Sequence, residues 1–248
     1  FATTLYDATQ FGPSPPLDLG VKKLIVLVHW WNPGSADYAY TGEFAALVTN
    51  LQAQIAADPN SGWRLVLYHW ERDSDTGPLI DFGLFISGAQ AAEIGYQHGR
   101  HLGELLNVAA PKLEQVHFIA HSAGSWVARG AMKYLLQMLP SSQPKPKTQL
   151  TLLDPFIPKE VSGISSNLSV ELMGEIPLFA SGQKVFRLEN YYSIDVTGNG
   201  TEVDDFGWGE TGFKQRVDWG AVMSATNRFY GDGFATGSFR DGHHGPIQ

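Results

Sequence analysis

Short runs of apolar residues, many of them β-branched, recur along the first three quarters of the chain, and turn-forming or polar residues bound each run. A continuous apolar run of this length predicts a strand that is buried on both faces of a sheet. The strands predicted in this way cover residues 24–28, 64–69, 115–120, 149–153 and 184–192.

Between these runs, apolar residues repeat at helical spacing, which predicts helices over residues 42–57, 86–107 and 122–139. The last is the clearest, since its apolar positions form a single stripe that ends before Pro140. Strands that alternate with helices through short connections predict an α/β fold with a mostly parallel central sheet and helices on both faces.

The length of 248 residues favours one large domain over two small ones, so a single domain over 1–248 is predicted. Residues 1–20 are rich in Pro and Gly and are predicted to form an irregular lead-in. Beyond residue 195 the chain becomes rich in Gly and aromatic residues, without a readable period. The sequence contains no internal repeat and no low-complexity tract.

The composition of the chain limits the classes of substrate, partner and site that it can have. A net charge of −8 argues against a nucleic-acid partner and against anionic substrates, while a neutral ester or lipid remains compatible. The absence of cysteine excludes disulfides, thiolate nucleophiles and cysteine zinc sites. No apolar run reaches the ~20 residues that a membrane span needs. Phe1 as first residue fits a removed signal peptide, hence secretion, or a trimmed chain equally well; the compartment and the oligomeric state stay open.

The segment Ala120-His121-Ser122-Ala123-Gly124 lies between a predicted buried strand and the clearest predicted helix. A nucleophile elbow needs this order, and it needs small residues two before and two after the serine because strand and helix crowd there. Ala120 and Gly124 meet that need, so we predict Ser122 to be a nucleophile in a fold of the α/β-hydrolase type. The alternative is a serine that only caps the helix.

The chain order of this fold, nucleophile then acid then base, restricts the partners of Ser122. His243 and His244 are the histidines that lie beyond the candidate acids; we predict His243 as the base, with His244 as the alternative. Asp154 ends one predicted strand and is the preferred acid, while Asp195 follows the next strand and is the alternative. A disordered end of the chain is the competing interpretation for both histidines.

Taken together, these segments resemble the pancreatic-lipase family and its bacterial relatives. The resemblance lies in the ordered blocks LIVLVHWWNPGS, ISGAQAAEIGYQHGRHLGELL, KLEQVHFIAHSAGSWVA, LTLLDPFIP and DGHHGPIQ. It implies a serine ester hydrolase, a lipase or esterase that needs no cofactor and no metal. It also implies that Asp154 is the triad acid and that the backbone N–H groups of Trp31 and Ala123 form the oxyanion hole. Trp30 and Phe156 are then expected to line an apolar acyl pocket, whereas for Trp31 core packing is an equal alternative.

The sequence also departs from that family. Trp30 stands where the family usually has Gly, which predicts a different path for the oxyanion loop, and Ala120 replaces the first Gly of the elbow. The family's cysteines, a disulfide-bounded lid and a second lipid-binding domain are absent, which favours an esterase or small lipase. Other serine hydrolases, such as thioesterases, acyltransferases or peptidases, and a catalytically silent binding domain remain alternatives. A metal site from Asp241, His243 and His244 is disfavoured because all three fall in one predicted loop.

Overall fold

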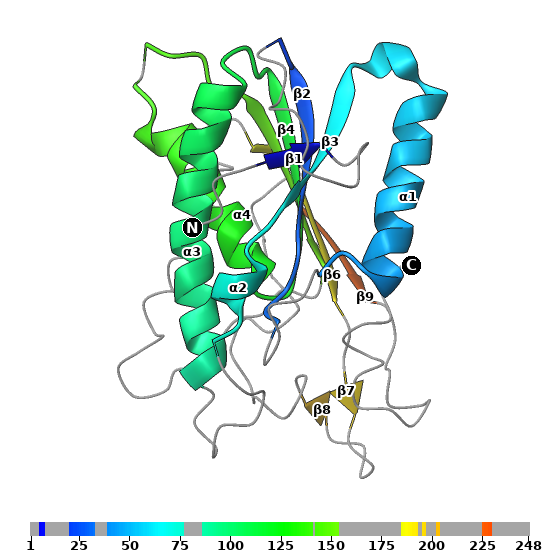
Figure 1. Ribbon diagram of the computed structural model, residues 1–248, viewed down its shortest axis with the longest axis vertical. Coiled ribbons are helices and arrows are strands. Elements are labelled where there is room, and N and C mark those ends of the chain that lie inside the picture. Colours follow the sequence, from blue (N-terminus) through cyan, green and yellow to red (C-terminus); the bar gives the residue numbers. More distant parts are fainter. Residues whose placement is uncertain are drawn as a thin grey trace.

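A twisted, mostly parallel sheet organises the molecule (Figure 1). The computed structural model describes residues 5–7, 20–32, 39–76, 86–140, 142–153, 185–192, 195–196, 202–203 and 225–229, with side chains in 20–32, 39–76 (Glu43 excepted), 90–140 and 142–153. The sheet has the order β1-β3-β2-β4-β5-β6-β9. Its strands are β1 (Leu5–Asp7), β2 (Lys23–Val28), β3 (Trp63–Tyr68), β4 (Gln115–His121), β5 (Lys147–Leu153), β6 (Val185–Tyr192) and β9 (Ala225–Phe229).

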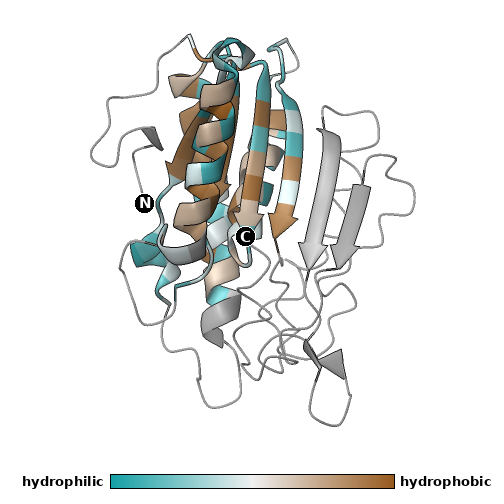
Figure 2. Cartoon of the chain, turned by 90° about the vertical axis from the view of Figure 1, so that its right-hand side faces the viewer, coloured by the Kyte–Doolittle hydropathy of each residue, from teal (hydrophilic) through white to brown (hydrophobic). Residues whose placement is uncertain are grey.

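Every pairing in this sheet is parallel except that of β1, which runs antiparallel to β3. The strands β7 (Asp195–Val196) and β8 (Glu202–Val203) form a separate antiparallel pair. In the hydropathy view, polar residues are interspersed along the coloured strands, and apolar residues are concentrated toward their carboxyl ends (Figure 2), where β4 and β5 are buried.

Helices cover the two faces of the sheet. The helix α1 (Gly42–Ala57) lies on one side, and α3 (Ile86–Ala109) and α4 (Gly124–Lys133) lie on the other (Figure 1). The strand β3 is preceded by a 3-10 turn, η1 (Pro59–Ser61), and followed by a short helix, α2 (Glu71–Ser74). The predicted α/β class, with a mostly parallel sheet between helices, is confirmed.

Several predicted boundaries change. The lead-in over 1–20 was expected to be irregular throughout, but it contains β1, whose three residues pair with the edge of β3. The helix expected over 122–139 begins at Gly124, and its last turns form the π-helix η2 (Tyr134–Met138). The strand β9 was not predicted, because its residues Ala-Thr-Asn-Arg-Phe show neither an apolar run nor a clear alternation.

The core between the sheet and α3 and α4 depends on close contact between the two helices. Gly99 of α3 and Gly130 of α4 face each other, and a Cβ at Gly99 would collide with the Val127 carbonyl oxygen and lie 2.8 Å from the Cα of Gly130. The absent side chains therefore let the two helix backbones touch. This contact fixes α4, the helix that follows Ser122.

Candidate active site

Ser122 occupies the strained turn that the sequence predicted. It has a φ of 50°, the one positive φ found for a non-glycine residue among the described residues. Its backbone N–H donates to the carbonyl of Leu153 at the end of β5, at 3.0 Å. The left-handed conformation costs on the order of 1–2 kcal/mol for a residue with a Cβ, so the surrounding fold must impose it.

The helix-cap alternative for Ser122 is wrong. The helix α4 begins at Gly124, and its cap residue is Ala123, whose side chain makes no cap hydrogen bond. Cap residues usually have extended backbones, whereas Ser122 is left-handed. Instead, the Ser122 carbonyl accepts from the backbone N–H of Ser125 at 3.1 Å and from its hydroxyl at 2.7 Å, which ties the turn to the first turn of α4.

The small residues flanking the turn are needed where they stand. A Cβ at Gly124 would collide with the carbonyl oxygen of His29 and lie 2.9 Å from that of Val28. The segment after β2 therefore lies directly against the start of α4, two residues from Ser122. Ala120 on β4 is fully buried, in the same core.

The segment after β2 is held by the side chain of its own first residue. His29 is fully buried, and its ring stacks on that of Trp70 at 5.4 Å between centroids and meets Tyr40 edge-on at 5.5 Å. Its Nδ1 lies 2.7 Å from the Trp30 carbonyl oxygen, and its Nε2 accepts from the Trp70 backbone N–H at 3.4 Å. This pattern requires the neutral ring with the proton on Nδ1. Burial agrees with it, since it lowers the pKa of His29 below 6.5.

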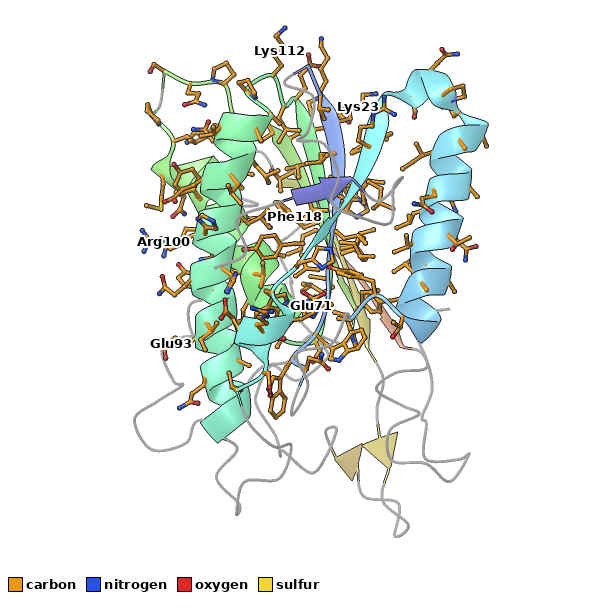
Figure 3. The ribbon with its side chains drawn as sticks, in the orientation of Figure 1. Lys23, Glu71, Glu93, Arg100, Lys112 and Phe118 are labelled. Carbon is orange, nitrogen blue, oxygen red and sulfur yellow. The ribbon has the colours of Figure 1, made fainter. Side chains whose placement is uncertain are left out.

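A carboxylate from α2 completes this cluster. The Oε1 atom of Glu71 lies 2.8 Å from Nδ1 of His69 and accepts from the Ala39 backbone N–H at 3.4 Å, while Oε2 lies 3.6 Å from Nε2 of His29. Burial alone would raise the pKa of Glu71, but its contacts with His29 and His69, of which the one with His69 is a hydrogen bond, outweigh burial and hold the pKa well below 4.5. Nδ1 of His69 is therefore the side-chain donor to Glu71. Figure 3 shows Glu71 in the interior, closer than Phe118 to the edge of the sheet at which the parallel strands end.

A second histidine cluster lies farther along the same segment. The Nε2 of His98 on α3 lies 2.8 Å from Oδ2 of Asp73, and its Nδ1 lies 2.8 Å from the Tyr68 hydroxyl. Burial lowers the pKa of His98, and it raises the pKa of Tyr68. Asp73, His98 and Tyr68 thus form a hydrogen-bonded series of acid, base and hydroxyl, the order found in a catalytic triad. However, Tyr68 and His98 are fully buried, so no substrate reaches them and the chain serves to join β3, α2 and α3.

The two tryptophans after His29 lie on different sides of the sheet. Trp31 is buried in the core formed with α3 and α4, which is the core-packing alternative that the sequence left open. Trp30 is half-buried and packs on the α1 side, 5.0 Å from Phe44 and 5.7 Å from His121 between ring centroids. His121, next to Ser122, is thereby turned to the α1 side, away from the core around Trp31.

The remaining predicted site residues are placed only in part. Asp154, Phe156, His243 and His244 lie outside the described residues, and Asp195 is described in its backbone alone, as the first residue of β7. Asp154 follows Leu153, the residue whose carbonyl holds Ser122, and the two histidines follow β9 in the same parallel set.

Sequence reasoning missed Glu71, His69 and Tyr40 as members of the site. The Tyr40 hydroxyl lies 2.8 Å from the carbonyl of Leu27 and 2.6 Å from that of Tyr68, so it ties the ends of β2 and β3 together. No motif marks these residues, because only the pairing of β2 with β3 makes them neighbours.

Within the described part of the chain, no three His, Asp or Glu side chains gather to hold a metal ion. No helix there is long and apolar enough to cross a membrane.

Comparison with known proteins finds distant structural neighbours alone. No family model matches the sequence, and no curated protein matches it significantly. The propionate-bound esterase Est2 of the planctomycete Thermogutta terrifontis is 9% identical with a TM-score of 0.36, covering 92% of this chain and 76% of that chain. A lipase-esterase related protein from Clostridium acetobutylicum is 9% identical with a TM-score of 0.39, covering 87% and 88%. Both are distant resemblances of backbone arrangement; they do not show the pancreatic-lipase family in particular, and neither neighbour's activity is carried over.

Proposed function

We propose that this chain is a serine hydrolase that cleaves neutral carboxylic esters through an acyl-enzyme on Ser122. The observation that carries the proposal is the strained backbone of Ser122 at the junction of β4 and α4. A fold that maintains a positive φ at a serine does so against a cost, and such strain is concentrated at functional sites. In a nucleophile elbow it lifts the hydroxyl above the sheet.

The topology supports the same place. The chain leaves β2 toward α1 on one face of the sheet and leaves the adjacent strand β4 toward α4 on the other face. Ligands of open α/β sheets bind where neighbouring connections diverge in this way, outside the carboxyl ends of the strands. Ser122 follows β4 and His29 follows β2, so both flank this point.

The triad of the proposal is Ser122, Asp154 and His243, with His244 and Asp195 as the alternative base and acid. The strands β4, β5, β6 and β9 run parallel, so the segments that follow them start from one edge of the sheet. This common edge supports a triad assembled from residues far apart in the sequence. The chemistry would suit a neutral substrate, in keeping with the net charge of −8.

In the proposed mechanism, His243 takes the Ser122 proton while the hydroxyl oxygen attacks the ester carbonyl, and Asp154 stabilises the imidazolium. The backbone N–H groups of Ala123 and Trp31 would stabilise the oxyanion, each worth about 3 kcal/mol. Collapse expels the alcohol, which takes the proton from His243. Water then hydrolyses the acyl-enzyme by the same steps and releases the acid. The chain uses no metal in this scheme.

Labelling with a fluorophosphonate probe and hydrolysis of p-nitrophenyl esters of increasing chain length test the proposal. The wild-type protein should be labelled and active. Ser122→Ala should lose labelling and at least about 10⁴-fold in kcat while it stays folded. Ser61→Ala is the matched control: it changes a serine of η1, before the amino end of β3 and away from the turn, and should still be labelled. A folded Ser122→Ala protein with near-normal turnover would refute the nucleophile, and an unlabelled wild type would point to a silent binding domain.

A further inference from the structure

The carboxylate of Glu71 lies at the hub of the polar cluster between β2 and β3. Only 10% of its side chain is exposed, and its oxygens contact His69, the backbone of Ala39 and the Nε2 edge of His29. A carboxylate in such a place is stabilised only when its oxygens are hydrogen-bonded, so the cluster has a defined arrangement rather than a loose one. The three groups come from three separate segments of the chain, which Glu71 thereby joins.

Trp70, the residue before Glu71, carries this arrangement to the segment after β2. Its backbone N–H donates to Nε2 of His29 at 3.4 Å, and its indole N–H donates to the His29 carbonyl oxygen at 3.1 Å. The same carbonyl oxygen packs against Gly124 at the start of α4. Trp70 therefore holds His29 at both its ring and its backbone, beside the turn that contains Ser122.

The ring of His29 in turn sets the orientation of one peptide group. Its Nδ1–H donates to the Trp30 carbonyl at 2.7 Å. That carbonyl and the N–H of Trp31 belong to one planar peptide, and no peptide bond in the described residues is cis. In a trans peptide the two groups point in opposite directions. Holding the carbonyl toward His29 therefore holds the Trp31 N–H away from it.

We propose that Glu71 is a positioning residue for the oxyanion hole: it fixes His29 through the adjacent Trp70, and His29 fixes the Trp30–Trp31 peptide. The inference rests on the proposed function, because it concerns the donor that stabilises the oxyanion in that reaction. Glu71 itself touches no substrate. Without Glu71, the backbone N–H of Trp31 is no longer held in one direction. A displacement of about 1 Å at a reacting site can cost 10²-fold in rate.

Asp73 provides a matched control on the same short helix. It also holds a buried histidine, but that histidine is His98 on α3, whose other ring nitrogen contacts the Tyr68 hydroxyl and whose ring lies 5.8 Å from that of Trp70. Removal of either carboxylate breaks one histidine hydrogen bond and destabilises the fold. A purely structural role for Glu71 predicts the same behaviour for both variants, whereas the positioning role separates them.

The experiment measures kcat and KM for a p-nitrophenyl ester, the melting temperature, and the inhibition constant of phenylboronic acid. The boronic acid adds the serine oxygen to boron and places a boron-bound oxygen where the oxyanion forms. For Glu71→Ala we expect kcat to fall about 100-fold, KM to stay within about twofold and boronic acid to bind about 100-fold more weakly. Glu71→Gln, which keeps the acceptor for His69 and Ala39, should recover kcat to within about fivefold of wild type. Asp73→Ala should lower the melting temperature but keep kcat within about twofold.

If Glu71→Ala does not fold, Glu71→Asp tests the positioning role instead. This variant keeps the charge but shortens the side chain by one methylene, which withdraws the carboxylate oxygens. We then expect kcat to fall about tenfold, with KM unchanged. The inference is overturned if folded Glu71→Ala or Glu71→Asp keeps wild-type kcat, or if Asp73→Ala loses as much kcat as Glu71→Ala. An active wild type with unaffected Glu71 variants refutes the positioning role alone. A wild type that neither hydrolyses esters nor reacts with fluorophosphonate overturns the proposed function, and this inference with it.

Discussion

The two faces of the sheet are packed by different means. On one face, α3 and α4 meet through Gly99 and Gly130, and their backbones touch. On the other face, α1 contacts the sheet through side chains, above all the buried Phe44 and Val48, and Tyr40 packs there just before the helix begins. The first contact has no adjustable part, whereas the second consists of rings and branched chains that can change rotamer. Ser122 lies where the two meet, since its turn leads into α4 while the neighbouring His121 faces the α1 side.

This difference teaches which part of the site is fixed most firmly. The helix that follows the serine is fixed to α3 by backbone contact, so the strained φ of Ser122 is imposed from that face. The segment after β2 is fixed by hydrogen bonds and stacked rings instead. We therefore expect substitutions on the α3 and α4 face to act on the whole fold, and those on the α1 face to be absorbed locally.

Gly99→Ala should have the largest effect on stability. Its Cβ would meet the Val127 carbonyl and the backbone of Gly130 and Ala131, none of which can rotate away. We expect a loss of about 3 kcal/mol or more in the free energy of unfolding, measured by urea denaturation. Gly62→Ala is the control, since Gly62 has a φ of 73° but open space around it, and it should cost only about 1 kcal/mol. Equal losses in the two variants would contradict the backbone contact.

Lowering the pH should have the next largest effect on the free energy of unfolding, because two histidines, His29 and His98, are buried in the folded chain. The pKa values of His29 and His98 are lowered by burial, so below pH 6.5 the unfolded chain takes up protons that the folded chain does not. The free energy of unfolding should therefore fall as the pH drops below 6.5, by up to roughly 1.4 kcal/mol per pH unit for each histidine.

Below pH 4.5 the unfolded Glu71 also takes up a proton, which steepens the loss, because its pKa in the folded chain is lower still. Urea denaturation at a series of pH values between 8 and 4 measures both ranges. His98→Gln should remove about one proton from the first range. A free energy of unfolding that stays constant from pH 8 to 5 would show that these histidines titrate alike in both states.

Phe44→Leu should have the smallest effect. Phe44 is buried between Trp30, Tyr40 and His121, at ring distances of 5.0–5.9 Å. Leu keeps most of the apolar contact, and the neighbouring side chains can repack, so we expect a loss of about 1 kcal/mol or less. Urea denaturation next to Gly99→Ala provides the direct comparison. A loss as large as that of Gly99→Ala would mean that the α1 face is as rigid as the other.

Much of the fold could be predicted from the sequence, because buried parallel strands show as plain apolar runs. The runs that became β2, β3, β4 and β5 each lie within two residues of the observed bounds. The strand β9 could not be found in this way, since it contains Thr, Asn and Arg. The three residues of β1 are too few for any period.

The candidate site likewise has a part that the sequence could predict and a part that it could not. Ser122 was predicted because the elbow is local: strand, small residue, serine, small residue and helix follow one another in the sequence. Glu71 and His29 lie 42 positions apart and become neighbours through the register of β2 and β3, in which Val28 pairs with Tyr68. No local pattern encodes that pairing. The acid and the base remain predictions, and so do the oxyanion donors and the acyl pocket.

The central position of β2 also has a consequence for how the chain is made. During synthesis its first neighbour, β3, emerges about 40 residues later, but its second neighbour, β4, follows only after about 90, because Val28 pairs with both Tyr68 and Ala120. Until then, the apolar edge of Lys-Leu-Ile-Val-Leu-Val stays open in the nascent chain. Open apolar edges pair with other chains, and distant pairings form slowly. The yield of refolding should therefore fall as protein concentration rises, even though the finished sheet encloses this strand completely.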